Sequence, residues 1–590
     1  MVVSNKIAGA MAVVAVALSF CLYAFAFEPF GVAEFAYVFA IPAILACKVL
    51  FVENKKRPRD PSKPKPFLRA YLAAAFAGSY LAWVWLLVWL RHVYPPSGWL
   101  AVVLLPLVIS SLFVFPWFAA LPLMLPKSSE DAFSRLLKLA GLAGLWVLLE
   151  WVRSWIFTGF PWLPLGNSQW TRIASIQSAS WGGVWIISFT LVFFNLAVAE
   201  YGYRVYLIQR KKFLRGESGI SKFAPEFYAA LLLVFASMWT YVANLPRAEN
   251  ETKLFRAGLV QPDFAGILKW DDSLASENFG VVNNLSSALA QRGVDVILLP
   301  EAATPPRYPI NLPIGKSWIE SLAKRLNTPI LTGNMTYDIE TRDAENGAFF
   351  VSEKTGVEPK YYAKQHLVPF GEYVPAPFTF LGKVVPVGNL KRGEGSAPVP
   401  AKIRGKDYKV GVMICYEDVF APLGRAASEN ADMLFVCTND SWYGTEAGAW
   451  QHASHSAIQA VANRKILLRS SNNGLSAVFD QYGRMLPCTT VKTPDAKAWR
   501  GTLPIPLRQP EISDEAGRPL DARTLKPKRP SPMTDENGSI YFRGCGYADV
   551  ISYKNFGAPT FYQKYGDWVV WASAVLFALG AFKSRKKSLK

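Results

Sequence analysis

The feature that most limits how this chain can fold is a series of long apolar runs in its first 245 residues. Each run is near or above the ~20 residues that a membrane-spanning helix needs. An eighth run lies close to the C-terminus. The first run is not taken for a cleaved signal peptide, because no clear small-residue cleavage site follows it and further runs come directly after. The sequence therefore predicts a multi-span α-helical membrane bundle, with runs at 7–27, 33–53, 69–91, 98–125, 135–152, 181–208, 225–244 and 567–583.

The basic residues of the chain flank these apolar runs. The formal net charge is +19, and the densest clusters lie in ENKKRPRDPSKPKP, QRKKFLRGESGISK and the tail SRKKSLK. That placement fits membrane topology better than a groove for phosphates, so no nucleic-acid partner is expected. With the N-terminus inside, all three segments fall on the cytoplasmic side, and residues 246–566 fall on the opposite side.

Residues 246–506 differ from the apolar part. Short β-rich segments such as VDVILLPE, YKVGVMIC and KYYAKQHLVP alternate with helical patterns such as WQHASHSAIQAVANR. This alternation favours a layered α/β domain. The segment VILLP is apolar throughout, as expected for a sheet covered on both faces.

Three domains follow from these patterns. We expect a bundle of about seven spans over 1–245, an α/β domain over 246–566, and a C-terminal transmembrane helix with a basic cytoplasmic tail over 567–590. Residues 507–555 are rich in Pro and charge and are predicted to be an irregular insertion in the α/β domain. No internal repeat is evident.

The loop after the fifth apolar run, RSWIFTGFPWLPLGNSQW, carries Trp155, Trp162 and Trp170. Trp is enriched at membrane interfaces, so the three side chains could form an aromatic belt. They could equally form the wall of a site where lipid reaches the protein. The sequence leaves the two interpretations even.

Three predicted strands end on a reactive side chain, which is where α/β proteins commonly place chemistry. Cys415 ends YKVGVMIC and precedes a predicted turn and helix, whose N-terminus would lower the thiol pKa. Glu301 ends VDVILLPE and could act as a general base. Lys364 lies in KYYAKQHLVPFGEYVP and could stabilise an oxyanion. Taken singly, each is more often structural: an inert buried thiol, a solvated carboxylate or a surface lysine.

Taken together, the words around these residues resemble the nitrilase superfamily, with its catalytic Glu-Lys-Cys set on an α-β-β-α sandwich. The whole chain resembles a narrower family, the bacterial apolipoprotein N-acyltransferases. The sequence segments that carry the resemblance are TGFPWLPLGNSQ, LVQPDFAGILKW, LLPEAATP, KQHLVPFGEYVP, ICYEDVF, NDSWYG and FYQKYGDWVVW. Residues 507–555 lie outside it.

The resemblance implies catalytic roles for Glu301, Lys364 and Cys415, and supporting roles for Glu372, Tyr416, Glu417 and Trp270. It implies ping-pong transfer of an acyl chain from a membrane phospholipid, through a Cys415 thioester, to the N-terminal amine of a diacylglyceryl apolipoprotein. It places the enzyme in the cytoplasmic (inner) membrane, with its catalytic domain facing the periplasm or exterior. It implies no cofactor.

Two rival functions differ in class. A membrane-anchored nitrilase or amidase acting on a small C–N substrate would need one anchor, so the seven N-terminal runs speak against it. A transporter or scaffold with a nitrilase-like binding module would be expected to lack the Glu-Lys-Cys set.

The remaining Cys and His residues are interpreted as follows. None of the six cysteines has zinc-site spacing, and no metal is expected. His452 and His455 are interpreted as packing residues. Cys488 and Cys545 are hypothesised to form a disulfide.

Overall fold

The computed structural model describes most of the chain. The described residues are 5–53, 66–93, 98–215, 223–245, 248–266, 269, 271–383, 390–491, 497–500, 503–506, 512–513, 519–520, 532–535, 537–553 and 558–585. The chain divides into two compact units. Unit 1 comprises Met1–Asn244 and Tyr565–Lys590, and unit 2 comprises Leu245–Lys564.

Unit 1 is a bundle of long helices, and the seven predicted N-terminal spans are confirmed as helical segments. Among the described residues, seven helical segments are long and apolar enough to cross a membrane: Lys6–Phe25, Ala33–Val52, Phe67–Leu86, Gly98–Met124, Ala132–Arg153, Ala179–Arg210 and Pro225–Ala243. Large apolar side chains such as Leu123, Leu232 and Trp239 lie exposed on them. A water-soluble bundle would bury such side chains, whereas lipid solvates them.

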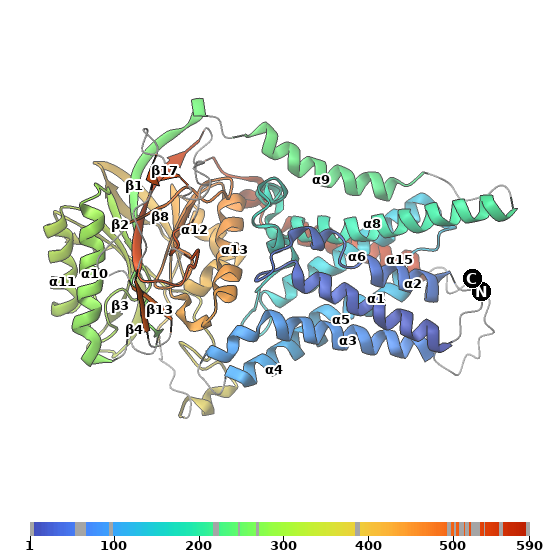
Figure 1. Cartoon of the computed structure of the whole chain (residues 1–590), viewed down its shortest axis with the longest axis horizontal. Helices are drawn as coiled ribbons and strands as arrows, with labels where there is room; N and C mark the ends of the chain where they lie inside the picture. Colours follow the sequence, from blue (N-terminus) through green and yellow to red (C-terminus); the bar gives the residue numbers. More distant parts are fainter. Residues whose placement is uncertain are drawn as a thin grey trace. The chain divides into compact units, whose positions relative to one another are not determined.

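The eighth predicted run forms helix α15 (Trp568–Arg585), which packs lengthwise against α6 (Ala132–Arg153) within unit 1 (Figure 1). Two glycines of α6 permit the close approach. A Cβ atom at Gly144 would lie 2.5 Å from the carbonyl oxygen of Ser573, and one at Gly141 would lie 2.8 Å from that of Leu576. Small residues at such crossings are typical of helices packed in a membrane. That α15 spans the membrane stays a prediction.

Besides two small two-stranded sheets, β13 (Lys497–Arg500) with β14 (Leu503–Pro506) and β15 (Ile512–Ser513) with β16 (Pro519–Leu520), the described part of unit 2 contains two large sheets. The first has the order β12-β17-β1-β2-β3-β4-β5, with β6 paired to β4, and the second has the order β11-β10-β9-β8-β7. The first sheet is built from β1 (Thr252–Gln261), β2 (Val296–Leu299), β3 (Ile330–Tyr337), β4 (Ala344–Ser352), β5 (Gly356–Val357), β6 (Tyr362–Ala363), β12 (Thr489–Val491) and β17 (Gly544–Ser552). The second is built from β7 (Val399–Ile403), β8 (Lys406–Ile414), β9 (Met433–Thr438), β10 (Ile466–Ser471) and β11 (Ala477–Phe479).

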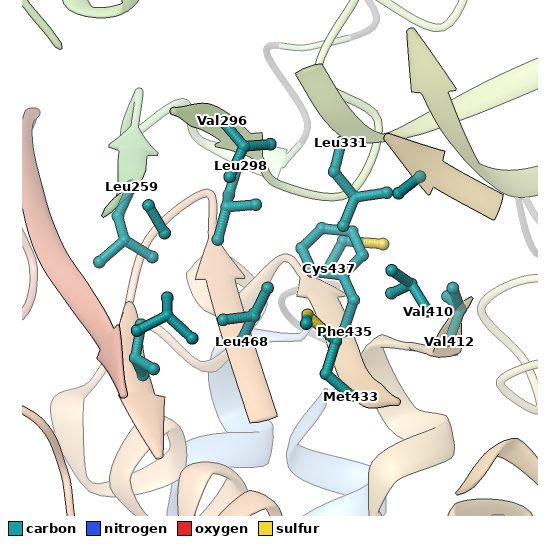
Figure 2. Packing of buried hydrophobic residues seen from close by; sticks show 14 of the residues in the cluster. Leu259, Val296, Leu298, Leu331, Val410, Val412, Met433, Phe435, Cys437 and Leu468 are labelled. Atoms are coloured by element: carbon teal, nitrogen blue, oxygen red, sulfur yellow. The ribbon is translucent and has the colours of Figure 1, made fainter. Parts of the chain in front are cut away.

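The two sheets pack face to face, and helices cover their outer faces. Figure 2 shows side chains of the first sheet, such as Leu298 and Leu331, meeting Phe435 and Leu468 of the second. Helices α10 (Ala275–Ala290) and α11 (Pro313–Leu326) cover the first sheet, and α12 (Ala421–Ser428) and α13 (Glu446–Asn463) cover the second (Figure 1). The predicted α-β-β-α sandwich is thus confirmed.

Three expectations need correction. The segment predicted as irregular contains β17, which pairs with both β1 and β12; alternate buried positions at Gly546, Ala548 and Val550 mark it as a strand. The strand predicted at KYYAKQHLVP is only two residues long, Tyr362–Ala363. Cys488 and Cys545 are both free thiols. The two thiols pack into different hydrophobic clusters, on opposite faces of the sheet. Cys545 is the strand partner of Val491, and Cys488 lies three residues before Val491, which places the two side chains on opposite faces.

Candidate active site

The three predicted catalytic residues lie just beyond the carboxyl ends of strands in the two packed sheets. Glu301 follows β2 after Pro300, Lys364 follows β6, and Cys415 follows β8. All three are nearly buried, with exposed fractions of 7 % for Glu301, 1 % for Lys364 and 8 % for Cys415. The two strands β8 and β9 are parallel, so Cys415 sits beside the end of β9.

Lys364 joins two carboxylates in one cluster. Its Nζ lies 2.8 Å from Glu372 Oε1 and 3.4 Å from Glu301 Oε1. Asn346 on β4 donates from Nδ2 to Glu301 Oε1 at 2.7 Å and to Glu372 Oε1 at 3.4 Å. Glu372 in turn accepts a hydrogen bond from the backbone N–H of Val368. The amide and the ammonium together fix both carboxylates.

Lys364 stays charged despite its burial. Desolvation lowers the pKa of a buried lysine, but here Glu372 first, then Glu301 and Cys415, raise the pKa of Lys364 well above its ordinary value. The charged form is therefore stable in a nearly dry site, where an ammonium interacts strongly with a nearby oxyanion.

Cys415 occupies a strained turn. Its φ is +53°, in the left-handed region that side-chain-bearing residues rarely adopt. The predicted lowering of its thiol pKa is wrong: burial and the charge of Glu301 raise it, and Lys364 only partly opposes them. The predicted turn and helix after Cys415 are confirmed as a 3₁₀ turn, Cys415–Val419, followed by α12 (Ala421–Ser428). The resting nucleophile is accordingly a neutral thiol that needs a base.

Glu417 joins the turn at Cys415 to the segment carrying Lys364. One oxygen accepts the backbone N–H groups of Gln365 and His366 at 2.7 and 3.0 Å, the other accepts that of Ile414 at 2.7 Å, and the Tyr362 hydroxyl donates to both. Burial raises the pKa of Glu417 to about 7. Tyr416 packs against the rings of His366 and Phe420.

Trp270 lies outside the described residues, so its predicted role stays untested. Its neighbour Lys269 is described and was missed by sequence reasoning. The buried Lys269 Nζ donates to the carbonyl oxygens of Glu301 and Ala302, both at 3.1 Å, and burial lowers its pKa to about 8. Because these carbonyls form the turn after β2, Lys269 braces the backbone of Glu301.

Sequence reasoning also missed a buried polar network behind Cys415, formed by Asp418, Asp440, His452 and Arg469. His452 was interpreted as a packing residue, yet both of its ring nitrogens contact carboxylates. Two signals could have revealed this. Asp418 and Asp440 each follow a predicted strand, in the segments ICYEDVF and NDSWYG. Arg469 lies in the middle of the otherwise apolar strand KILLRSS. Among the described residues, no group of His, Cys, Asp or Glu is arranged to hold a metal ion.

The tryptophan-rich loop of unit 1 has a mixed character. Trp162 and Trp170 are buried, whereas Trp155 and Phe157 are 54 % and 80 % exposed. The backbone N–H of Leu165 donates to the buried Glu150 at 2.7 Å, which ties the loop to α6. The most exposed side chains of the loop are therefore Trp155 and Phe157, at its tip.

Comparisons with known proteins cover both units. Residues 19–197 match the family described as apolipoprotein N-acyltransferase N-terminal domain, and residues 256–494 match the carbon-nitrogen hydrolase family. An apolipoprotein N-acyltransferase of Geobacter metallireducens is 29 % identical over 79 % of this chain and 85 % of its own. Enzymes of the same name from Rickettsia typhi and Pseudomonas putida are each 30 % identical. Those matches cover 63 % and 68 % of this chain, and 71 % and 75 % of the respective relatives.

Proposed function

The chain belongs to the apolipoprotein N-acyltransferase family, and from that membership we propose how its buried Glu-Lys-Cys cluster acylates a lipoprotein. The protein is an acyltransferase that N-acylates lipoproteins. Its acyl donor is a membrane phospholipid, and its acceptor is the N-terminal amine of a diacylglyceryl-cysteine. The observation that carries this proposal is a neutral thiol at a left-handed turn, within electrostatic reach of one carboxylate and one ammonium.

In the first half-reaction, Glu301 takes the proton of the Cys415 thiol. The thiolate attacks the ester carbonyl carbon of the phospholipid, and the Lys364 ammonium stabilises the oxyanion that forms. When the tetrahedral intermediate collapses, the C–O bond breaks and the lysophospholipid oxygen takes the proton from Glu301. The acyl chain is left as a thioester on Cys415.

In the second half-reaction, the neutral amine of the lipoprotein attacks the thioester carbonyl, and Glu301 accepts the proton that the nitrogen loses. Lys364 again stabilises the oxyanion. The C–S bond then breaks, and Cys415 recovers its proton from Glu301. Glu372 supports both steps by holding Lys364 charged, Glu417 and Tyr416 support the turn, and the apolar face of Trp270 contacts an acyl chain.

The chain is a multi-pass membrane protein, and we place it in the cytoplasmic (inner) membrane with unit 2 facing the periplasm or exterior. The positive-inside rule supports this orientation, because the segments around Lys55, Arg210 and Lys587 carry the densest basic clusters. The C-terminal helix α15 would then return the chain to the cytoplasmic side. Lipid donors and lipid-anchored acceptors both reside at that membrane.

The test is intact-protein mass spectrometry after incubation of the purified protein with phospholipid. An acyl mass is expected on the wild type, absent from Cys415→Ser, and discharged when a diacylglyceryl lipopeptide is added. Cys437→Ser is the matched control, because Cys437 is a buried thiol on the neighbouring strand and should leave the adduct intact. Lipopeptide acylation by wild type without any adduct on Cys415 would contradict the thioester route.

A further inference from the structure

The network behind Cys415 is a closed ring of charges. Arg469 on β10 donates from Nη1 to Asp418 Oδ2 at 2.8 Å and from Nη2 to Asp440 Oδ2 at 2.9 Å. His452 on α13 bridges the same two aspartates, with Nδ1 2.8 Å from Asp440 Oδ1 and Nε2 2.8 Å from Asp418 Oδ1. All four side chains are fully buried.

Charge balance in this dry ring requires a protonated His452. Two aspartates and one guanidinium leave one uncompensated negative charge, which an imidazolium cancels. Desolvation lowers a buried histidine's pKa, but Asp418 and Asp440 overcome it and raise the pKa of His452 to about 9. Burial opposes it, but His452 first and then Arg469 hold the pKa of Asp418 down at about 2. In this form both ring nitrogens carry hydrogens: Nε2 faces two oxygen atoms, whereas Nδ1 lies 2.8 Å from Asp440 Oδ1 and also 3.0 Å from Arg469 Nη2.

One of those hydrogens reaches the nucleophile's own backbone. His452 Nε2 lies 3.2 Å from the carbonyl oxygen of Cys415 with hydrogen-bonding geometry. Asp418 Oδ1 acts toward the same nitrogen as a counter-ion, since no hydrogen bond to that oxygen is formed. The residue whose carbonyl is held is the one with φ of +53°.

We propose that His452 is a positioning residue for the acyl transfer: its imidazolium, held by Asp418 and Asp440, donates to the Cys415 carbonyl and thereby fixes the left-handed turn that aims Sγ at Glu301 and Lys364. This inference rests on the proposed thioester function. His452 contacts no reacting atom. Its effect is on the geometry of the attacking sulfur, where a misplacement of about 1 Å can cost on the order of 100-fold in rate.

The first test compares two histidines of α13. His452→Gln should lower the single-turnover rate of Cys415 acylation by phospholipid about 100-fold at pH 7.5, while half-saturating phospholipid stays within two-fold. His455→Gln is the matched control, because His455 is also buried on α13 and lies one turn away; its rate should stay within about two-fold of wild type. Equal rates for His452→Gln and wild type, or equal losses in both variants, would overturn the inference. If wild type forms no thioester at all, the proposed function fails first and the inference falls with it.

The second test does not depend on whether a His452 variant folds. In wild type the acylation rate should fall as pH rises through about 9, because His452 then loses its second proton. Asp440→Asn removes one stabilising charge and should move that fall to lower pH by about one unit. A fall that stays in place in Asp440→Asn would assign it to another group and overturn the inference. The groups that face His452 are Asp418, Asp440, Arg469, Tyr443 and Cys415, and His455 faces Asp418 from the same helix.

Discussion

The two sides of the active site differ in net charge and in exposure to solvent. The base side consists of Glu301, Lys364, Glu372 and Asn346, and the nucleophile side consists of Cys415 with Asp418, Asp440, His452 and Arg469. On the base side Glu372 keeps 16 % and Glu301 9 % of its side chain exposed, whereas the four charged groups behind Cys415 keep none. Two carboxylates and one ammonium leave the base side with a net negative charge, while the ring behind Cys415 is neutral.

This difference separates two tasks. An unbalanced, slightly open cluster can accept a proton from a thiol or an amine and return it, because one carboxylate is always in excess. A fully buried ring without net charge is not expected to exchange protons near neutral pH. It can instead hold the backbone in a strained conformation. We therefore expect substitutions on the base side to change chemistry more than folding, and substitutions in the ring to change both.

The largest effect on chemistry is expected from Glu301→Gln. A positioned general base is worth about 10²–10⁴-fold in rate, and the raised pKa of Cys415 leaves almost no thiolate without it. The single-turnover acylation rate at pH 7.5 should fall about 1000-fold. It should then climb with pH up to about 9, because solvent hydroxide begins to ionise the thiol, and fall above that pH as His452 loses its proton. A rate within ten-fold of wild type would show that the base side does not supply the base.

The next effect contrasts the two buried cations. Arg469→Met leaves two sealed aspartates with one histidine, and breaking a buried pair typically costs about 3–5 kcal/mol of unfolding free energy. Lys364→Met should cost less, because Glu372 is partly exposed and solvent can stabilise its charge. It should nonetheless slow acylation about 100-fold, because the oxyanion loses its ammonium. Thermal unfolding in detergent and acylation rates of both variants check this. A larger stability loss in Lys364→Met would reverse the proposed contrast.

A smaller effect is expected from Glu372→Gln. Glu372 is the strongest electrostatic partner of Lys364, so its neutralisation lowers the pKa of Lys364. Acylation needs the charged lysine, which exists below its pKa. The fall of the rate caused by Lys364, which in the wild type lies above the His452 fall at about pH 9, should therefore move to lower pH. At pH 7.5 we expect a loss of about 10-fold, because Glu301 and Asn346 still hold the cluster. An unchanged pH profile would mean that Glu372 acts otherwise than through Lys364.

The sequence predicted the strand-end positions of Glu301 and Cys415, because apolar strands and the reactive residues that follow them are local patterns. It predicted the seven N-terminal helices for the same reason. It missed β17, since Cys545 to Ile551 follow a long Pro- and charge-rich stretch that hides their alternation. It also misjudged the thiol pKa of Cys415, because burial by a second sheet is a tertiary effect that no local pattern records. His452 was missed on the same ground: its partners come from three other elements.

The smallest predicted effect tests whether the two sides move as one. Tyr362 stands next to the base side on β6, and its hydroxyl donates 2.9 Å hydrogen bonds to both oxygens of Glu417, which follows Cys415. Tyr362→Phe should cost about 1–3 kcal/mol of unfolding free energy, as expected when a buried acceptor loses one of its donors. The acylation rate should fall only a few-fold, because three backbone N–H groups still hold Glu417.

Tyr361→Phe is the matched control for this bridge. Its hydroxyl donates to Glu345 at 2.7 Å in an exposed position, so its loss should change the unfolding free energy by no more than about 0.5 kcal/mol. If Tyr362→Phe destabilises the protein but leaves acylation untouched, the bridge holds the fold without coupling the two sides. If it slows acylation as much as Glu372→Gln does, Glu417 aligns the nucleophile with the base, and the division between the two sides is less sharp than their exposures suggest.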